Sequence, residues 1–440
     1  MITGPEIAER AASVAVAQSD FTVAGILDAL LEIRGGQRRL TGLSAVAIEV
    51  VQHFGSGRRL LRDELQEFFA GSAAFRKAFA RSGAVVPMGA PAMQPVAGLH
   101  VSVQLPALTT LAALRDWLAL YDDELAVYTS TYRGDLDRSG TRWRHYHYQW
   151  YARRGSPPRL IEAPKQRLKD LQVRIASGML RHVPAHDAAH GFVRGRSVLT
   201  GVQQHVGQRC VLRMDLEDCF ASIARGRVLR VFLNIGYPED VAVVLAQLCT
   251  TATPTAQLHR LATPATERSA RLLGKLRASH LPQGAPSSPA LMNLALYRID
   301  ARLRGLAARF GATYSRYADD LLFSGDDAFR RDARRCADHA AAILLAERLH
   351  VAHHKTRIMC SSQAQRSCGL VLNERAALPR RERQRIEAIL HNCVQHGPST
   401  QNRSEVSDFR AHLQGRVAHA KRFDLSGRLA SLLARIDWQR

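Results

Sequence analysis

The sequence of 440 residues has no apolar run long enough to cross a membrane and no hydrophobic N-terminal segment of the kind that directs secretion. Its seven cysteines are scattered and show no C-x-x-C spacing, which argues against a zinc site or a disulfide framework. These absences exclude a membrane protein and favour the reducing cytoplasm. A length of 440 residues suffices for two or three domains with substantial cores, and a hydrophobic content of 46% without a long apolar run favours a soluble protein.

Acidic residues are scarce in most of the chain, and the net charge is +22 at pH 7. Residues 1–125 carry 11 Lys and Arg against 13 Asp and Glu, whereas residues 126–440 carry 50 against 26. Basic side chains bind nucleic acid because they neutralise phosphates and release counterions. The distribution therefore predicts a nucleic-acid partner for the second part of the chain and a different role for the first.

Three aspartates stand out against this basic background. Residues 312–325 read ATYSRYADDLLFSG, in which two strand-like runs flank an Ala-Asp-Asp connection that suits a hairpin tip with Asp319 and Asp320. Upstream, residues 211–223 read VLRMDLEDCFASI, and a strand-like run ends at Asp215. Adjacent carboxylates repel each other unless a cation lies between them, although Asp-Asp is also ordinary turn chemistry. The three acids together predict a site for two Mg²⁺ ions, or Mn²⁺ in their place, as nucleotidyl transfer requires.

A third motif lies between the other two. Residues 281–296 read LPQGAPSSPALMNLAL, and with the YADD and D-L-x-x-x-F motifs they resemble a bacterial reverse transcriptase of the retron and phage-defence type. The resemblance covers roughly residues 150–440. It implies an RNA-directed DNA polymerase that uses template RNA, an RNA/DNA hybrid and dNTPs.

The resemblance also implies an α+β fold of right-hand polymerase type. Fingers are expected at 126–210, a palm with an antiparallel sheet at 211–373, an inserted fingers segment at about 225–280, and a helical thumb at 374–440. Before them, residues 7–16, 23–33, 43–54 and 60–79 carry apolar residues at helical spacing, and they predict a mainly helical N-terminal domain at 1–125. This domain either packs on the polymerase or docks a dedicated RNA or an accessory protein.

Several residues match positions that contact the incoming nucleotide in the resembling family. Phe220, five residues after the first aspartate, would exclude a 2′-hydroxyl, and Gln283 would lie near the sugar. Arg159, Lys165 and Lys355, the last expected on a strand, would approach the triphosphate. The alternatives are a core phenylalanine, an ordinary basic helix start and a solvated basic strand end.

Other residues are expected to contact nucleic acid. The family signature H-G-F-x-x-G-R-S at 190–197 implies a close approach of the template backbone, and the basic C-terminal helices imply phosphate contacts, although a run of charge is often only a solvated face. Residues 128–154 interleave aromatics with Arg and either line an RNA track or form a packed hairpin. The residues expected to bind nucleic acid are Gly191, Arg194, Arg196, Tyr317, Gly369, Arg380, Arg381, Arg416, Lys421 and Arg422.

Two marks of the retron subgroup are degraded. Residues 201–205 read GVQQH and keep only His205 of N-A-x-x-H, and residues 367–369 read SCG and keep only Gly369 of V-T-G. A retron-like enzyme would copy a dedicated non-coding RNA into RNA-linked cDNA in antiphage defence. A defence reverse transcriptase with different priming, or an inactive scaffold that binds nucleic acid, are the alternatives.

Overall fold

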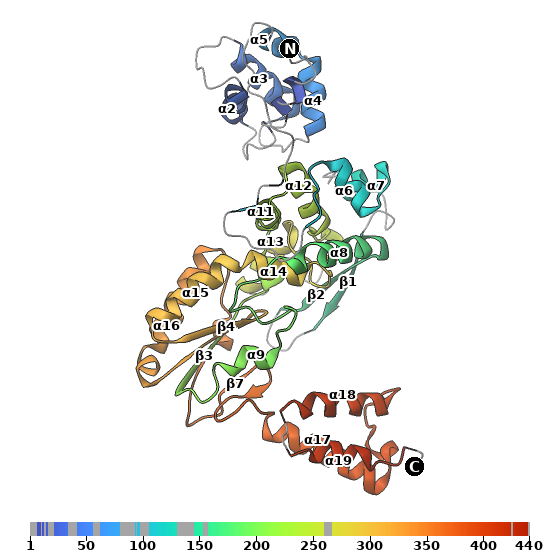
Figure 1. Cartoon of the computed structure of the whole chain (residues 1–440), viewed down its shortest axis with the longest axis vertical. Helices are drawn as coiled ribbons and strands as arrows, with labels where there is room; N and C mark the ends of the chain where they lie inside the picture. Colours follow the sequence, from blue (N-terminus) through green and yellow to red (C-terminus); the bar gives the residue numbers. More distant parts are fainter. Residues whose placement is uncertain are drawn as a thin grey trace. The chain divides into compact units, whose positions relative to one another are not determined.

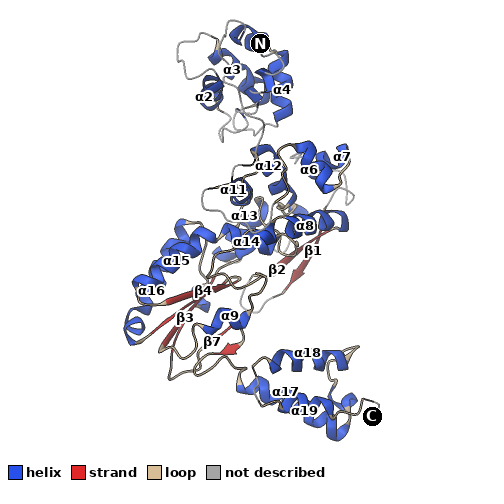
Figure 2. Ribbon diagram, viewed as in Figure 1, coloured by secondary structure: helices blue, strands red, loops and turns tan. Residues whose placement is uncertain are grey.

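The computed structural model describes residues 7–9, 11–12, 15, 22–33, 42–55, 62–79, 93, 95–96, 105–129, 145–152, 157–258, 266–423 and 426–438. The chain forms two compact units, and each is assembled from separate stretches of sequence. The first unit comprises Met1–Val183, Ala224–His259 and Arg277–Ala285, and the second comprises Pro184–Ile223, Arg260–Leu276 and Pro286–Arg440. Figures 1 and 2 show that helices predominate and that the strands are few.

The first unit begins with a cluster of short helices. The helices expected at 23–33 and 43–54 are confirmed, whereas the one expected at 60–79 is divided at Ser72. The Ser72 hydroxyl accepts a hydrogen bond from the N–H of Phe75 at 3.0 Å and so caps the second of the two pieces. The helices are α2 (Val23–Ile33), α3 (Leu43–Phe54), α4 (Arg62–Gly71) and α5 (Ala73–Phe79).

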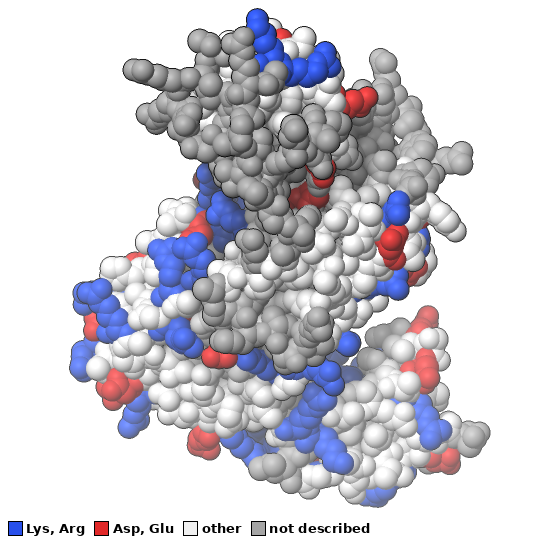
Figure 3. Space-filling model, turned by 45° about the horizontal axis from the view of Figure 1, so that its top comes forward, with Lys and Arg blue, Asp and Glu red and all other residues white. Residues whose placement is uncertain are grey.

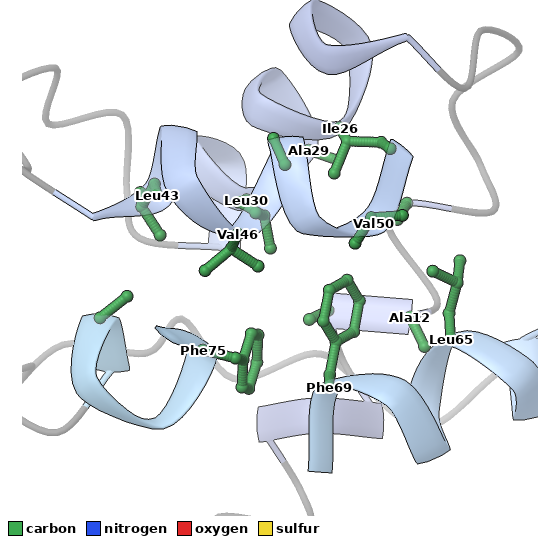
Figure 4. Packing of buried hydrophobic residues seen from close by; sticks show 14 of the residues in the cluster. Ala12, Ile26, Ala29, Leu30, Leu43, Val46, Val50, Leu65, Phe69 and Phe75 are labelled. Carbon is green, nitrogen blue, oxygen red and sulfur yellow. The ribbon is translucent and has the colours of Figure 1, made fainter. Parts of the chain in front are cut away.

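These four helices and the described residues of segment 7–16 enclose a hydrophobic core of their own (Figure 4). That segment was expected to be helical and contributes the buried Ala8, Ala11, Ala12 and Ala15, and its residues 10, 13, 14 and 16 lie outside the described residues. Leu30, Val46 and Phe69 are fully buried within it, and the Phe69 ring stacks on the Phe75 ring with centroids 4.7 Å apart. Truncating a buried phenylalanine such as Phe69 to alanine costs about 3–5 kcal/mol. The buried apolar faces of these helices confirm the helical packing that was predicted from the apolar spacing.

The remainder of the first unit contains both helices and strands. A buried Gln172 amide donates to the Tyr146 hydroxyl at 3.0 Å and to the Leu248 carbonyl at 2.8 Å, and so ties three elements together. The Trp150 indole donates to the Gln257 carbonyl. Tyr146 and Trp150, two aromatics of the 128–154 stretch, thus pack within the unit. Residues 130–144 and 153–156 of that stretch lie outside the described residues. The elements are α6 (Leu111–Leu118), α7 (Asp122–Thr129), the antiparallel pair β1 (Tyr146–Tyr151) and β2 (Arg159–Pro164), α8 (Gln166–Gly178), α11 (Arg225–Ile235) and α12 (Glu239–Leu248).

The boundary expected at residue 125 falls inside helix α7. Glu124 of this helix pairs with Arg167 of α8 at 2.7 Å. Trp117 of α6 lies so close to Gly178 that a Cβ there would meet the indole ring at 2.7 Å. Helices α6 and α7 thus pack with α8.

The second unit is built on a four-stranded antiparallel sheet in the order β4-β5-β3-β6, which confirms the α+β class. Helices α15 (Tyr297–Arg309) and α16 (Asp327–Ala346) lie side by side over the sheet (Figure 1). The Asp326 carboxylate accepts from the N–H groups of Ala328 and Phe329 and begins α16 immediately after β5. The strands are β3 (Cys210–Asp215), β4 (Thr313–Tyr317), β5 (Asp320–Gly325) and β6 (Arg357–Cys360).

The C-terminal part of this unit is helical, as expected. A short hairpin precedes it, and its turn residues Cys368 and Gly369 both have positive φ, at 49° and 80°. The helices then enclose a separate cluster around Leu390, Leu413 and Val417. The elements are β7 (Arg366–Ser367), β8 (Leu370–Val371), α17 (Arg380–His396), α18 (Phe409–Lys421) and α19 (Arg428–Ala434).

His205 follows the short helix α9 (Val198–Gln203) and is fully buried. Its Nδ1 lies 2.7 Å from the Ser324 hydroxyl and its Nε2 lies 2.8 Å from the Ser315 hydroxyl. The ring therefore joins α9 to both strands of the β4-β5 hairpin. Burial lowers the pKa of His205 to about 3, so the imidazole is neutral in the folded protein.

This burial predicts a loss of stability in acid. An unfolded histidine has its ordinary pKa of 6.5, so the unfolded chain binds more protons than the folded one from about pH 6.5 down to about pH 3. The free energy of unfolding should fall as the pH is lowered through this window, by roughly 2 kcal/mol at pH 5 from His205 alone. Urea unfolding at pH 7 and pH 5 measures the loss. His205→Gln keeps a donor and an acceptor for the two serines, and it should lose that much less. Equal losses in both proteins would contradict the prediction.

Candidate active site

The hairpin at the centre of the second unit brings three carboxylates together. Asp215 is the last residue of β3, and the antiparallel register places it opposite Asp320, the first residue of β5. Asp319 lies in the two-residue turn that joins β4 to β5, and its carbonyl accepts the N–H of Leu216 at 3.0 Å. Two neighbouring strands thus end at one acidic point. The strand that ends at Asp215 and the hairpin around Ala-Asp-Asp, both predicted from the motifs, are present.

Burial and mutual repulsion act on these acids. Burial raises the pKa of Asp319, and the negative charges of Asp215 and Asp320 raise it further. Burial also raises the pKa of Asp320, against the lowering effect of the Arg213 guanidinium. A cation at this point would relieve both effects, because it stabilises the ionised carboxylates.

Two basic side chains already neutralise part of the acidic point. The Lys355 ammonium lies 2.7 and 2.9 Å from the two oxygens of Asp215, and the Arg213 guanidinium donates to Asp320 at 2.8 and 3.0 Å. Lys355 is the last residue of a short 3-10 turn, His353–Lys355. The prediction that it lies on a strand is therefore wrong, because the strand begins only at Arg357.

The donor set suits a hard divalent cation, because carboxylate oxygens are the ligands that Mg²⁺ prefers. However, the described part of the chain contains no preformed group of three or more His, Cys, Asp or Glu side chains that could hold a metal. In this structure, Asp215 is paired with Lys355 and Asp320 with Arg213. A metal ion at Asp215 and Asp320 would compete with these two side chains.

Arg213 was missed by the sequence analysis. It lies two residues before Asp215 on the same strand, and alternate residues of a strand share one face. A basic residue two positions before an acidic strand end is therefore a usable signal. Lys355 was expected to meet a triphosphate, but in the structure it is bonded to Asp215.

Phe220 lies in the same unit as the aspartates, in the short helix α10 (Cys219–Ser222), and it is half-buried. Asp218, just before this helix, has a left-handed backbone with φ 48° and ψ 48°. Neighbouring Cys219 is buried, and burial raises its pKa to about 12. Phe220 is thus only partly enclosed, while the adjacent cysteine packs in the core.

The other nucleotide candidates belong to the first unit. Arg159 is exposed at the start of β2, and Lys165 is the residue that precedes α8. The Gln283 carbonyl accepts the N–H of Glu162 at 2.8 Å. Buried Glu162 also pairs with His280 at 2.8 Å, so the L-P-Q-G loop is held against β2. These three candidates belong to the first unit, and the aspartates belong to the second.

In the H-G-F-x-x-G-R-S loop, some side chains are bonded within the loop and others are exposed to solvent. Arg196 donates to three carbonyls of its own loop, at 2.6 to 3.0 Å, so its expected contact with nucleic acid would have to replace these bonds. Arg194 is exposed. Phe192, which the sequence analysis did not single out, is 54% exposed and has φ 63°, an unusual backbone conformation for a bulky residue. Gly191 lies against the turn of the β4-β5 hairpin, at Ala318.

The remaining candidates for nucleic-acid binding lie at the hairpins and on the C-terminal helices. Tyr317 ends β4 opposite Asp320, and Gly369 lies in the β7-β8 turn. Arg416 pairs with Glu382, so it is not a freely exposed charge. The exposed candidates of this region are Arg380, Arg381, Lys421 and Arg422.

Basic side chains are spread widely over the face shown in Figure 3, and acidic ones are fewer. This agrees with the excess of Lys and Arg after residue 125. Among the described helices, none has the length and apolar character needed to traverse a lipid bilayer.

Comparison with known proteins agrees with the geometry. A sequence profile of the family "Reverse transcriptase (RNA-dependent DNA polymerase)" matches residues 153–389. The chain is 40% identical over 294 residues to the retron Mx65 reverse transcriptase of Myxococcus xanthus, which covers 65% of this chain and 63% of that protein. It is 35% identical over 275 residues to the retron Mx162 reverse transcriptase of the same organism, covering 59% of this chain and 55% of that protein.

A more distant match is the retron Ec86 reverse transcriptase of Escherichia coli, 29% identical over 235 residues, covering 53% of this chain and 65% of that protein. The chain thus spans somewhat less than two thirds of the length of these relatives. The profile match extends over more than half of the 440 residues and includes all three motifs. The chain therefore belongs to the reverse transcriptase (RNA-dependent DNA polymerase) family, and the relatives named above are retron reverse transcriptases of bacteria.

Proposed function

We propose that the chain is an RNA-directed DNA polymerase that extends a primer on an RNA template with dNTPs. The observation that carries this proposal is the pairing of Asp215 with Asp320 across neighbouring strands, with Asp319 in the adjoining turn. We assign the palm to residues 211–373, the thumb to 374–440 and the fingers to the stretch from the end of helix α7 to residue 210, together with about 225–280. Family membership supports this right-hand arrangement.

Asp215, Asp319 and Asp320 would hold the metal ions, which we propose to be two Mg²⁺, with Mn²⁺ as a substitute. When bound, such ions lower the pKa of an attacking hydroxyl and offset the charge of the leaving pyrophosphate. The raised pKa values of Asp319 and Asp320 support this assignment, because acids that repel each other gain most from a cation.

The protein's own residues supply the remaining selectivity. Phe220 would lie over the sugar and exclude ribonucleotides, and Gln283 would lie near the sugar. Lys355 is bonded to Asp215 at 2.7 Å, and we propose that it turns to the nucleotide phosphates when this carboxylate is engaged elsewhere. Arg159 and Lys165 would add positive charge at the triphosphate.

The retron relatives support a retron-like role, in which a dedicated non-coding RNA is copied into RNA-linked cDNA. We further propose that the product serves antiphage defence. The helices α2 to α5 have a core of their own, and their segment lacks the positive charge of the remainder. They would bind a cognate RNA or an accessory effector protein, while α17 and α18 follow the hybrid.

One observation favours a second candidate, an inactive scaffold that binds nucleic acid. Asp215 and Asp320 are both paired with basic residues of the chain, and no preformed metal cluster occurs among the described residues. In a scaffold, these ion pairs would be permanent and purely structural. The two candidates differ in whether the aspartates are needed for dNTP incorporation.

One prediction of the proposed function concerns Asp319. Asp319→Asn should reduce Mg²⁺-dependent dNTP incorporation by at least about a hundredfold, because one metal-binding carboxylate is lost. Binding to primer–template should stay the same or tighten, since one negative charge near the phosphates is removed. Primer extension and a binding titration at the same salt concentration measure both effects.

Asp338→Asn is the matched control, because Asp338 is an exposed acid on α16 and its loss changes the net charge equally. It should leave extension unchanged. Activity of Asp319→Asn within tenfold of wild type would rule out the metal assignment. Absence of incorporation in the wild type as well would favour the scaffold.

A further prediction concerns Phe220. Phe220→Ala should open the space over the sugar, so that ribonucleotides are accepted at least about tenfold better relative to dNTPs. The use of dNTPs should change only modestly. Single-nucleotide incorporation with matched dNTP and rNTP pairs measures the ratio of kcat/KM values. An unchanged ratio would mean that the ring is simply part of the core.

A further inference from the structure

The turn that carries Asp319 has an unusual backbone. Ala318, immediately before the aspartate, has φ 56°, in the left-handed region that residues with a side chain seldom adopt. Such a conformation persists only where the surroundings hold it in place. The contacts around Ala318 therefore bear directly on the position of Asp319.

Arg316 supplies the first of these contacts. Its side chain is 1% exposed and donates to both carboxylate oxygens of Asp300, at 2.7 and 2.8 Å. Its Nη1 also donates to the Asn293 side-chain oxygen and to the Ala318 carbonyl, each at 3.0 Å. A buried guanidinium held by four hydrogen bonds has little freedom to move, so it fixes the carbonyl of the strained residue.

A second contact comes from the loop ahead of α9. The N–H of Arg316 donates to the Ala188 carbonyl at 2.7 Å, and the N–H of His190 donates to the Arg316 carbonyl at 2.8 Å. The Asn293 amide donates to the Gly191 carbonyl at 2.8 Å. Segment 188–191 is thus bonded along β4, and Asn293 links it to the Arg316 guanidinium.

Gly191 closes this arrangement. A Cβ at Gly191 would lie 2.6 Å from the backbone nitrogen of Ala318 and 3.3 Å from its Cα. The φ of Gly191 is outside the left-handed region, so an alanine there would be acceptable to its own backbone. The glycine is required because the hairpin turn occupies the space.

We propose that Arg316, Asp300, Asn293 and segment 188–191 form a hairpin support that sets the position of Asp319. These are positioning residues, and none of them touches a substrate in this account. Gly191 then serves the catalytic turn, whereas the sequence analysis expected it to admit the template backbone. The proposal rests on the proposed polymerase function.

Metal chemistry explains why such a support would matter. Mg²⁺ demands near-ideal octahedral geometry, so its carboxylate ligands must be held within a few tenths of an ångström, whereas Mn²⁺ accepts a less regular arrangement. Small misplacements of reacting groups cost orders of magnitude in rate. A displaced Asp319 should therefore impair the reaction with Mg²⁺ more than the reaction with Mn²⁺.

The test is Gly191→Ala in the full chain. With Mg²⁺, kcat for dNTP incorporation should fall by about tenfold or more, while KM for dNTP and Kd for primer–template change by less than about threefold. The ratio of Mn²⁺ to Mg²⁺ activity should rise several-fold. Without substrates, the increase in Tm caused by Mg²⁺ should be smaller than in wild type.

Gly305→Ala is the matched control, because Gly305 lies in α15 with no atom within 4 Å of the added methyl group. All these quantities should stay at wild-type values. If Gly191→Ala does not fold, Asn293→Ala removes the link to segment 188–191 and should give the same pattern.

The proposal is overturned if Gly191→Ala, or Asn293→Ala in its place, behaves like Gly305→Ala. A loss confined to the Kd for primer–template would also overturn it and would restore the template contact. If the wild type incorporates no nucleotide, the proposed function fails. The Mg²⁺-dependent Tm of the variants then still tests the hairpin support.

Discussion

The register of β3 against β5 is the constraint on which the candidate site depends. It places Asp215 opposite Asp320 and leaves Asp319 in the turn. Because side chains alternate along a strand, a slip of one residue would turn Asp215 to the other face of the sheet. Burial of Leu212, Met214 and Leu321 on the two strands opposes such a slip. The hydrophobic core and the acidic site are therefore specified by the same pairing.

Near this pairing, acidic side chains form two kinds of ion pair with basic residues of the chain, one accessible to solvent and one buried. The acidic point is neutralised from within by Lys355 and Arg213, both partly accessible to solvent. Beneath it, Arg316 and Asp300 form a fully buried ion pair. The first pairs can exchange partners, which suits residues that would meet metal ions and phosphates. The second has all its partners within the protein and suits a fixed support.

Much of this site could be predicted from local patterns. The apolar runs on each side of Ala-Asp-Asp predict the hairpin, and the acid after VLRM predicts a strand that ends in a carboxylate. Other features could not be predicted, because their partners are far apart in sequence. Lys355 and Asp215 are separated by 140 residues, and Arg213 and Asp320 by 107. The position of Arg213 on its strand is a local signal, but the sequence does not say which acid either basic residue will pair with.

Gly191 and Ser72 show the difference between a feature that depends on a distant contact and one that depends on the local sequence. The glycine could be recognised as a place of close approach, but the sequence does not say which backbone approaches it, and in the structure it is Ala318. At Ser72, the Gly-Ser pair is a local signal for the break between α4 and α5 that helical periodicity alone overlooks. The prediction is reliable where the cause is local, as in caps and hairpin turns. It fails where the cause is tertiary.

The most direct test of the central claim is primer extension by the purified full chain on an RNA template, followed as a function of Mg²⁺ concentration. The account predicts templated DNA synthesis that is absent without a divalent ion and that rises with more than the first power of Mg²⁺ concentration, because two ions are needed. No incorporation at any concentration of Mg²⁺ or Mn²⁺ would contradict it, and the three aspartates would then have to be explained as part of a binding scaffold.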